Sequence, residues 1–285
     1  MDKIITLFKS TTFKKRPLQT IINLLNLIFC IIFSINPKIK INIGKINLIY
    51  KIFNIRIKNF GGKGLLIYRE WIEDLFFLAP RILGQKKNII IDAGANFGMY
   101  SILFAKLNIK NQVYSIEPFK EYNKIILHNS KLNNLKNIKI INKVLSDKIA
   151  KYKLNKNLGN TSASITRKFN KASYIGVKSI TIDRLVKTNK IKKIDFIKLD
   201  VEGAELMALQ GGKKSIKNFK PKIALECSSK KEFYEINKFL MEFNYKPFSF
   251  DKKKNNFVMQ TSFSKFYKNL FFFNKKHFHL IKNNK

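Results

Sequence analysis

Cysteine and histidine are scarce in this chain of 285 residues. The two cysteines, Cys30 and Cys227, lie far apart in apolar runs, so they form neither a disulfide framework nor a C-x-x-C metal pair. None of the three histidines has a cysteine or aspartate neighbour at zinc-ligand spacing. These scarcities argue against a disulfide-stapled domain and a structural zinc site, and they predict a reducing compartment without a bound metal.

Acidic residues and arginine are also few. The chain has 18 acidic residues against 56 basic ones, for a formal net charge of +38, yet only six of the basic residues are arginine. Such an excess is typical of proteins that meet nucleic acid or anionic membranes. Selection for phosphate binding favours arginine, whereas lysine accompanied by abundant isoleucine and asparagine indicates A/T-rich codons. The charge alone is therefore a weak functional signal.

Apolar residues are plentiful, at 45% of the chain, and they are spread along its length. This excludes disorder for most of the chain and provides for one large domain with an extension. We expect four parts: an amphipathic or membrane-associated helix in residues 1–37, short strands or a hairpin in 38–64, the main domain in 65–260 with an insertion at 150–190, and a basic aromatic tail in 261–285.

The first part contains an apolar stretch, Leu18 to Ile35, that follows a Lys-Lys-Arg cluster and ends before Pro37. Polar residues recur in it every three to four positions, which draws a stripe along one side of a helix. The stripe favours a helix lying on a membrane or packed on a domain, with a membrane span as the less favoured alternative. No small-residue cleavage site follows, which argues against a cleaved signal peptide. The stripe comprises Gln19, Asn23, Asn26, Cys30 and Ser34.

Beyond Lys38, isoleucines alternate with polar residues to Ile57, which predicts short strands. After a glycine-rich break, helical spacing runs from Tyr68 to a cap at Gly84. Short isoleucine-rich runs then alternate with amphipathic stretches, a pattern that predicts a doubly wound, mostly parallel α/β sheet of Rossmann-like type. The expected strands are Ile89–Ile91, Val113–Ile116, Ile138–Ile141, Phe196–Leu199 and Ile223–Leu225.

The tail interleaves aromatic residues with lysines from Phe263 to Phe273. We expect a basic amphipathic helix there, and an edge helix packed on the sheet is an equally good interpretation. The polar insertion, centred on Gly159-Asn160-Thr161-Ser162, is expected to carry substrate contacts.

The most informative stretch reads IIIDAGANFGMYSILFAKL, residues 89–107. A strand ends at Asp92, a turn uses Gly94 and Gly98, and a helix begins at once, which places free N–H groups and a partial positive charge beside a ligand. The spacing D-x-G-x-x-x-G differs from the G-x-G-x-x-G that holds a dinucleotide pyrophosphate. Glu117, followed by Pro118, ends the second strand where a ribose diol is usually bound.

The fourth strand ends in KLDVEGAE, residues 198–205. Asp92 and Asp200 should close neighbouring strands at the crevice where such sheets bind ligands. Lys198 lies on the same strand face as Asp200, so a buried Lys198–carboxylate pair is expected, and it would serve structure alone in the simplest interpretation. Glu202 and Glu205 add carboxylates, but without histidine a metal is the minority view.

IDAGANFGMYS, IEPFKEYNKIILHNSKLNNL, IDFIKLDVEGAELMALQGG and PKIALE together resemble the FkbM-type family of S-adenosylmethionine-dependent methyltransferases. The resemblance covers about Tyr68 to Cys227, with KLDVEGAE the most discriminating element. It implies a class I methyltransferase fold, S-adenosylmethionine as methyl donor, and O-methylation of hydroxyls on sugars, glycans or other natural products. The cofactor-binding set that it implies is Asp92, Ala93, Gly94, Ala95, Asn96, Gly98, Tyr100, Glu117, Pro118, Ser146 and Asp147.

Methyl transfer to a neutral hydroxyl benefits from a general base. Our hypothesis gives that role to Glu202 or Asp200, with Glu226 in reserve; the simpler interpretation is that all three only hold the backbone or the cofactor. We expect a cytoplasmic enzyme with a small-molecule or glycan acceptor and a peripheral contact with anionic membrane.

Three other functions agree with part of the sequence. An NAD-dependent oxidoreductase fits the fold but not the glycine spacing. A nucleic-acid methyltransferase or binding module fits the charge, but the expected site residues are acidic and would repel phosphate, so no nucleic acid is expected. A non-catalytic membrane-surface protein would rest on the two terminal segments.

Overall fold

The computed structural model describes residues 16–43, 45–51, 73–155, 164–166, 174–264 and 269–281. The chain divides into two compact units, one comprising residues 1–72 and 158–161, the other 73–157 and 162–285. The predicted strands around Ile55 and Ile57, the start of the helix expected at Tyr68, and the centre of the polar insertion lie outside the described residues.

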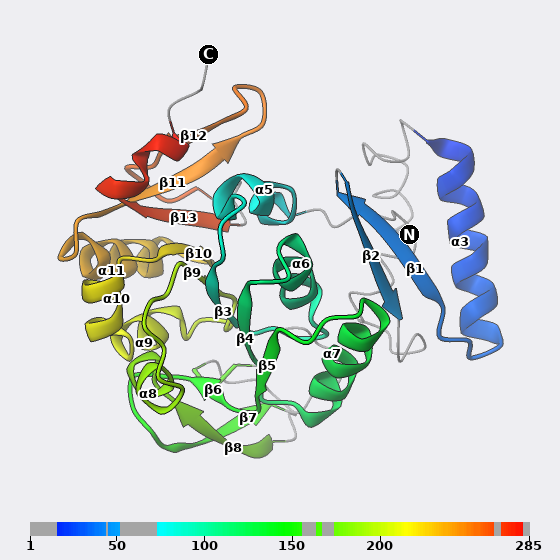
Figure 1. The fold of residues 1–285 in the computed structure, drawn as a ribbon, viewed down its shortest axis with the longest axis horizontal. Coiled ribbons are helices and arrows are strands. Elements are labelled where there is room, and N and C mark those ends of the chain that lie inside the picture. Colours follow the sequence, from blue (N-terminus) through cyan, green and yellow to red (C-terminus); the bar gives the residue numbers. More distant parts are fainter. Residues whose placement is uncertain are drawn as a thin grey trace. The chain divides into compact units, whose positions relative to one another are not determined.

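In the first unit, the described residues 16–43 and 45–51 form one helix and one hairpin (Figure 1). Helix α3, Pro17–Ile32, confirms the predicted N-terminal helix, with proline at its first position, where no N–H is needed. Among the residues that the structure describes, no helix is long and apolar enough to cross a membrane. Strands β1, Lys38–Ile43, and β2, Ile46–Lys51, pair antiparallel, as the alternating isoleucines predict.

The second unit is built on a sheet of eight strands in the order β12-β11-β13-β10-β9-β3-β4-β5. Its parallel part confirms the five predicted strands. They are β3, Ile89–Ala93; β4, Gln112–Ile116; β5, Ile138–Ile141; β9, Phe196–Leu199; and β10, Lys222–Glu226. Their residues are almost continuously buried in β3, β4, β9 and β10, because helices cover both faces of the sheet.

Two layers of helices enclose this sheet (Figure 1). One holds α5, Asp74–Leu83; α6, Met99–Leu107; and α7, Lys120–Leu132. The other holds α8, Ile182–Thr188; α9, Glu205–Gln210; α10, Lys213–Phe219; and α11, Lys230–Met241. Helix α5 ends at the predicted Gly84 cap, but Glu73 has an extended backbone, so a continuous helix from Tyr68 is wrong at that residue.

A small sheet in the order β6-β8-β7 begins before the predicted insertion, 150–190, and takes its other two strands from it. Its strands are β6, Val144–Leu145; β7, Lys151–Asn155; and β8, Tyr174–Ile180. Strand β6 pairs parallel with β8, and β7 pairs antiparallel with it.

The tail is the main correction to the sequence analysis. In place of a helix it forms strand β13, Asn269–Asn274, followed by a short 3-10 helix, Lys275–Leu280. Strand β13 lies between β10 and β11, Tyr245–Asp251, and β11 pairs in turn with β12, Asn256–Met259. The sequence Leu-Phe-Phe-Phe is buried throughout, as in an interior strand covered on both faces, and this continuous run outweighs the helical spacing of the flanking aromatic residues.

Candidate active site

The carboxyl ends of four parallel strands meet at one edge of the sheet. From β3 the chain proceeds through β4 to β5 on one side, whereas β9 and β10 lie on the other. The order therefore reverses between β3 and β9, where doubly wound sheets bind ligands. Asp92 on β3 stands beside Lys198 on β9 in register, which confirms that Asp92 and Asp200 close neighbouring strands.

The turn after β3 approaches the end of β9 closely. Gly94 has φ +71°, and a Cβ added there would lie 1.8 Å from the Asp200 carbonyl oxygen. Gly98, with φ +88°, precedes the first residue of α6. Between them Asn96 also has a left-handed backbone, at φ +51°, and its buried Oδ1 has no hydrogen-bond partner among the described residues. Only glycine fits at position 94, because both the backbone angle and the space exclude a side chain.

Lys198 joins the two neighbouring strands through a buried ion pair. Its Nζ lies 3.1 Å from Asp200 Oδ2 and 3.8 Å from Asp92 Oδ1, which confirms the expected Lys198–carboxylate pair. The same ammonium group stands 4.8 Å from the centre of the Tyr100 ring. Burial lowers the pKa of Lys198, but the negative charges of Asp200 and Asp92 together raise it by more than burial lowers it. The pKa therefore lies above its usual value, and the side chain stays charged.

Asp92 is fully buried, with its Oδ2 accepting a hydrogen bond of 2.5 Å from Ser101 Oγ on α6. Ser101 Oγ also lies 2.9 Å from Ser115 Oγ on β4, so a polar network links three elements behind the glycine turn. Burial raises the pKa of Asp92, although Lys198 and Ser101 oppose the shift.

Glu117, the residue after β4, is buried at the same edge. Its Oε2 accepts a hydrogen bond of 2.8 Å from the Asn96 N–H, and its Oε1 accepts one of 2.9 Å from the Phe119 N–H. Burial raises the pKa of Glu117 to about 7 against the effect of these two donors. A carboxylate offers about four acceptor sites, so about two remain for a ligand. Asn142, beyond β5, donates to the carbonyls of Glu117 and Pro118 and fixes this corner.

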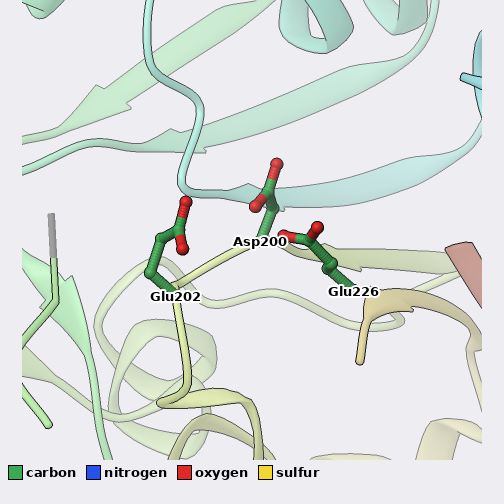
Figure 2. A group of neighbouring side chains, drawn as sticks. All are labelled: Asp200, Glu202 and Glu226. Carbon is green, nitrogen blue, oxygen red and sulfur yellow. The ribbon is translucent and has the colours of Figure 1, made fainter. Parts of the chain in front are cut away.

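Asp200, Glu202 and Glu226 form a group of three partly buried carboxylates, which we call the acidic trio (Figure 2). One oxygen from each lies within 4.8 Å of the others. Burial raises the pKa of Glu226 to about 7, and the negative charges of Asp200 and Glu202 add to the shift. The trio brings together all three residues that the sequence analysis proposed for catalysis. Oxygens in this arrangement could hold an organic cation or a hard divalent metal ion.

The loop that carries two members of the trio is held by buried side chains. Glu202 has an unfavourable left-handed backbone, at φ +54°. Glu205, which begins α9, accepts hydrogen bonds of 2.9 Å from the N–H groups of Val201 and Gly203. From the insertion, Ser164 Oγ donates to the Glu202 carbonyl at 2.6 Å. These three hydrogen bonds stabilise the conformation that directs Glu202 toward its neighbours.

Ser146 follows β6 rather than β5, which places it in the small sheet. Its Oγ lies 2.9 Å from Asp147 Oδ1 and 2.8 Å from the Tyr152 hydroxyl. A Cβ added at Gly211, the C-cap of α9, would lie 2.1 Å from the Ser146 carbonyl oxygen, so the end of α9 packs tightly on Ser146. The cofactor-binding role that the resemblance implies for Ser146 and Asp147 stays a prediction.

Residues 92–247, more than half of the chain, match the model of the methyltransferase FkbM domain. The chain belongs to this family. The match begins at Asp92 and includes the glycine turn, Glu117 and the acidic trio. The class I methyltransferase architecture expected from the sequence is therefore confirmed.

Solved methyltransferases are similar in structure but remote in sequence. The FkbM methyltransferase of Methylobacillus flagellatus has 16% identity and a TM-score of 0.46, over 66% of this chain and 44% of that one. This chain thus spans less than half of that relative. An O-methyltransferase of Thermotoga maritima has 14% sequence identity and a TM-score of 0.41, over 71% of this chain and 64% of that one. A putative methyltransferase of Streptococcus mutans, solved in complex with SAH, has 13% sequence identity and a TM-score of 0.41, over 71% of this chain and 98% of that one. No curated protein matches by sequence.

The residues at this edge fit S-adenosylmethionine, the donor that the family implies. Gly94 and Gly98 give the turn its left-handed backbone, and between them Asn96 Oδ1 is a buried acceptor without a partner among the described residues. Glu117 retains acceptor capacity for a ribose diol, and the acidic trio suits a molecule with a positive sulfur. Asp92, Gly94, Asn96 and Glu117 are thus the residues that would hold it.

Several supporting residues escaped the sequence analysis. Glu73, at the bend before α5, accepts a hydrogen bond of 2.6 Å from the Tyr100 hydroxyl, and its charge acts on both Lys198 and Glu226. Ser101 lies one residue past Tyr100 on a helix that reads as an ordinary apolar segment. Among the supporting residues, only Glu205 could have been found from the sequence. The E-x-x-E spacing of Glu202 and Glu205 places an acid at the start of a helix, where such a side chain commonly caps the loop before the helix.

Proposed function

We propose that this protein transfers a methyl group from S-adenosylmethionine to a hydroxyl group of a sugar, a glycan or another natural product. The observation that carries the proposal is the convergence of the acidic trio beside the Gly94 turn, within an FkbM domain. That turn supports the donor site, and the trio supports a site for the acceptor hydroxyl.

Bound S-adenosylmethionine supplies a methyl group that its positive sulfur already activates. The protein must hold the acceptor oxygen in line with that methyl group and keep water away. As the new O–C bond forms and the S–C bond breaks, a carboxylate of the trio takes the hydroxyl proton. Lys198 is not available for that task, because it is charged and paired with Asp92 and Asp200.

Glu226 is the member of the trio best suited to accept a proton near neutral pH, since its pKa lies at about 7. This favours Glu226 over its reserve place in the sequence hypothesis, and the negative charge of Asp200 beside it contributes to the raised pKa of Glu226. Below pH 7 the carboxyl is protonated and cannot serve as a base, so turnover should rise with pH through about 7. The Glu226→Gln variant should lose about 100-fold or more in turnover and also lose this pH limb.

The test begins with calorimetry. S-adenosylmethionine should bind and NAD should not, and Asp92→Asn should weaken the binding. Glu202→Gln and Glu226→Gln should keep cofactor binding while labelled methyl transfer falls. Glu242→Gln, an exposed carboxylate on the far end of α11, is the matched control and should change neither. Unchanged turnover in both trio variants would remove the catalytic assignment, and tight binding of NAD would remove the proposed activity.

The acceptor class needs its own experiment. Labelled methyl groups should appear in polysaccharide fractions of cells that express the protein, and Glu226→Gln should abolish the label. Methylation of RNA instead, with binding that falls steeply as salt rises, would favour the nucleic-acid alternative.

We propose further that the enzyme is cytoplasmic and works at the surface of an anionic membrane. The first 72 residues contain thirteen lysines and arginines, whereas Asp2 and Glu70 are their only acidic residues. Each basic residue near an anionic surface favours binding by about 1 kcal/mol.

A further inference from the structure

Helix α3 exposes the side that a helix of a water-soluble domain normally buries. Exposed fractions reach 71% at Leu18, 60% at Leu25 and 61% at Phe33, the residue that caps the helix. Leu18, Ile22, Leu25, Phe29 and Ile32 follow one another at intervals of three to four positions, so they share one continuous side of the helix. We call this side the outer face of α3; it consists of Leu18, Ile22, Leu25, Phe29, Ile32 and Phe33.

The opposite side of α3 is buried, although it is partly polar. Thr20, Asn23, Leu27 and Cys30 are each at most 7% exposed. Thr20 Oγ1 donates to the Arg16 carbonyl at 2.8 Å, and Gln19 Nε2 donates to Asn23 Oδ1 at 3.2 Å, so the Thr20 hydroxyl and the Asn23 carbonyl oxygen have partners within the helix and its N-cap. Two members of the polar stripe, Asn23 and Cys30, thus lie on the buried side of the helix, and the apolar residues lie on its exposed side. This is the reverse of the usual amphipathic arrangement.

A contiguous apolar face of this kind marks an interaction surface. The charges of the same unit decide between occupants. The described residues 16–43 and 45–51 include Arg16 and four lysines but no acidic residue. A second copy of the chain would bring another net charge of +38 against the first, and this repulsion disfavours self-association. An anionic lipid surface offers both an apolar phase and the complementary charge.

The length of the helix sets its orientation. The 16 residues of α3 extend for about 24 Å, less than the roughly 30 Å of a bilayer core. We infer that α3 lies in the plane of an anionic membrane, with its outer face in the boundary between headgroups and acyl chains and its partly polar side held against the protein. This inference supplies the contact surface for the membrane association proposed above, and it is independent of the methyl-transfer chemistry.

Vesicle flotation of the full chain tests the inference, with phosphatidylcholine vesicles that either contain or lack phosphatidylserine. The wild type should float with the anionic vesicles and much less with the neutral ones. The double variant Leu25→Ser/Phe29→Ser should bind at least about tenfold more weakly. The matched control is Ile109→Ser/Leu127→Ser, which removes two exposed apolar side chains from the other unit and should float like the wild type.

Binding of S-adenosylmethionine, measured by calorimetry in both variants, separates this result from the catalytic proposal, because none of the substituted residues belongs to the candidate active site. Equal flotation of Leu25→Ser/Phe29→Ser and the wild type would overturn the inference. Equal binding of the wild type to neutral and anionic vesicles would also overturn it. A wild type that is a dimer, does not bind vesicles and dissociates on this substitution would instead assign the outer face to a second copy.

Discussion

At the scale of single residues, the site depends on one buried cation. Lys198 stands between Asp92 and Asp200 and is 3% exposed, so its charge balances a carboxylate that water cannot reach. Removing one partner of a buried pair leaves an uncompensated charge, which is far more costly than the loss of an exposed pair.

We therefore predict that Lys198→Met lowers the free energy of unfolding by roughly 3–5 kcal/mol. Lys193→Met is the control, because the ion pair between Lys193 and Asp195 is largely exposed on the lysine side and should contribute at most about 1 kcal/mol. Urea unfolding of both variants measures the difference. Similar losses in the two would show that burial does not set the strength of the Lys198 pair.

A second prediction concerns the glycine turn. Gly94→Ala should weaken S-adenosylmethionine binding and destabilise the fold, since the new Cβ meets the Asp200 carbonyl and the left-handed backbone alone costs about 1–2 kcal/mol. Gly176→Ala, on β8, meets nothing within 4 Å and has no positive φ, so it should leave binding and melting temperature unchanged. Calorimetry and thermal melts of the pair provide the test, and normal binding by Gly94→Ala would contradict the proposed cofactor turn.

At the scale of elements, the loop between β9 and α9 depends on Glu205. This side chain is 1% exposed, and burial, followed by the neighbouring Glu232, raises its pKa to about 8 from an ordinary 4.5. The folded chain therefore holds a proton that the unfolded chain releases between these values. The contribution to stability is complete below pH 4.5 and is lost as pH rises through about 8.

From this sign we predict that Glu205→Gln is less stable than the wild type at pH 5.5 and that the difference narrows toward pH 8.5, by at most about 1.4 kcal/mol per pH unit. The substitution also removes an acceptor for one backbone N–H, which should lower turnover by displacing Glu202. Denaturant unfolding across this pH range is the measurement, with Glu242→Gln as a control whose difference should not vary. A constant difference for Glu205→Gln would show that its proton does not contribute.

The parallel core and its site could be predicted from the sequence, because local patterns determine them. Isoleucine runs indicated β3, β4, β9 and β10, and a left-handed turn between a strand and a helix requires Gly94. The strand that neighbours Asp92 could be predicted from the strand order of a doubly wound sheet. Long-range partners such as Glu73 could not be predicted, since nothing in the local sequence shows that its carboxylate meets the Tyr100 hydroxyl. The predicted helix in the tail was wrong, because four consecutive buried apolar residues favour an interior strand more strongly than the spacing of the aromatic residues favours a helix.

At the scale of the whole molecule, the acidic site contrasts with a chain of net charge +38. The carboxylates gather at the carboxyl ends of the strands, and most lysines lie on exposed helix and strand surfaces. The unit that contains α3 is the more one-sided of the two in charge, which agrees with the anionic lipid surface that we propose as its partner.

Deleting residues 261–285 provides a test at this scale. We predict that the truncated chain does not fold, because β13 is hydrogen-bonded to β10 on one side and to β11 on the other. Circular dichroism and melting of the truncated chain beside the full one measure this outcome. A truncated chain that melts cooperatively and binds S-adenosylmethionine would show that the parallel strands are stable without β13.

The position of β13 also bears on synthesis of the protein. Strands β11 and β12 join the sheet only through β13, so until residue 274 has been translated they are a tethered hairpin beside an open β10 edge. That edge, with Ile223, Ala224 and Leu225 unpaired on one side, is an open strand edge at which we expect a nascent chain of this protein to be exposed to aggregation.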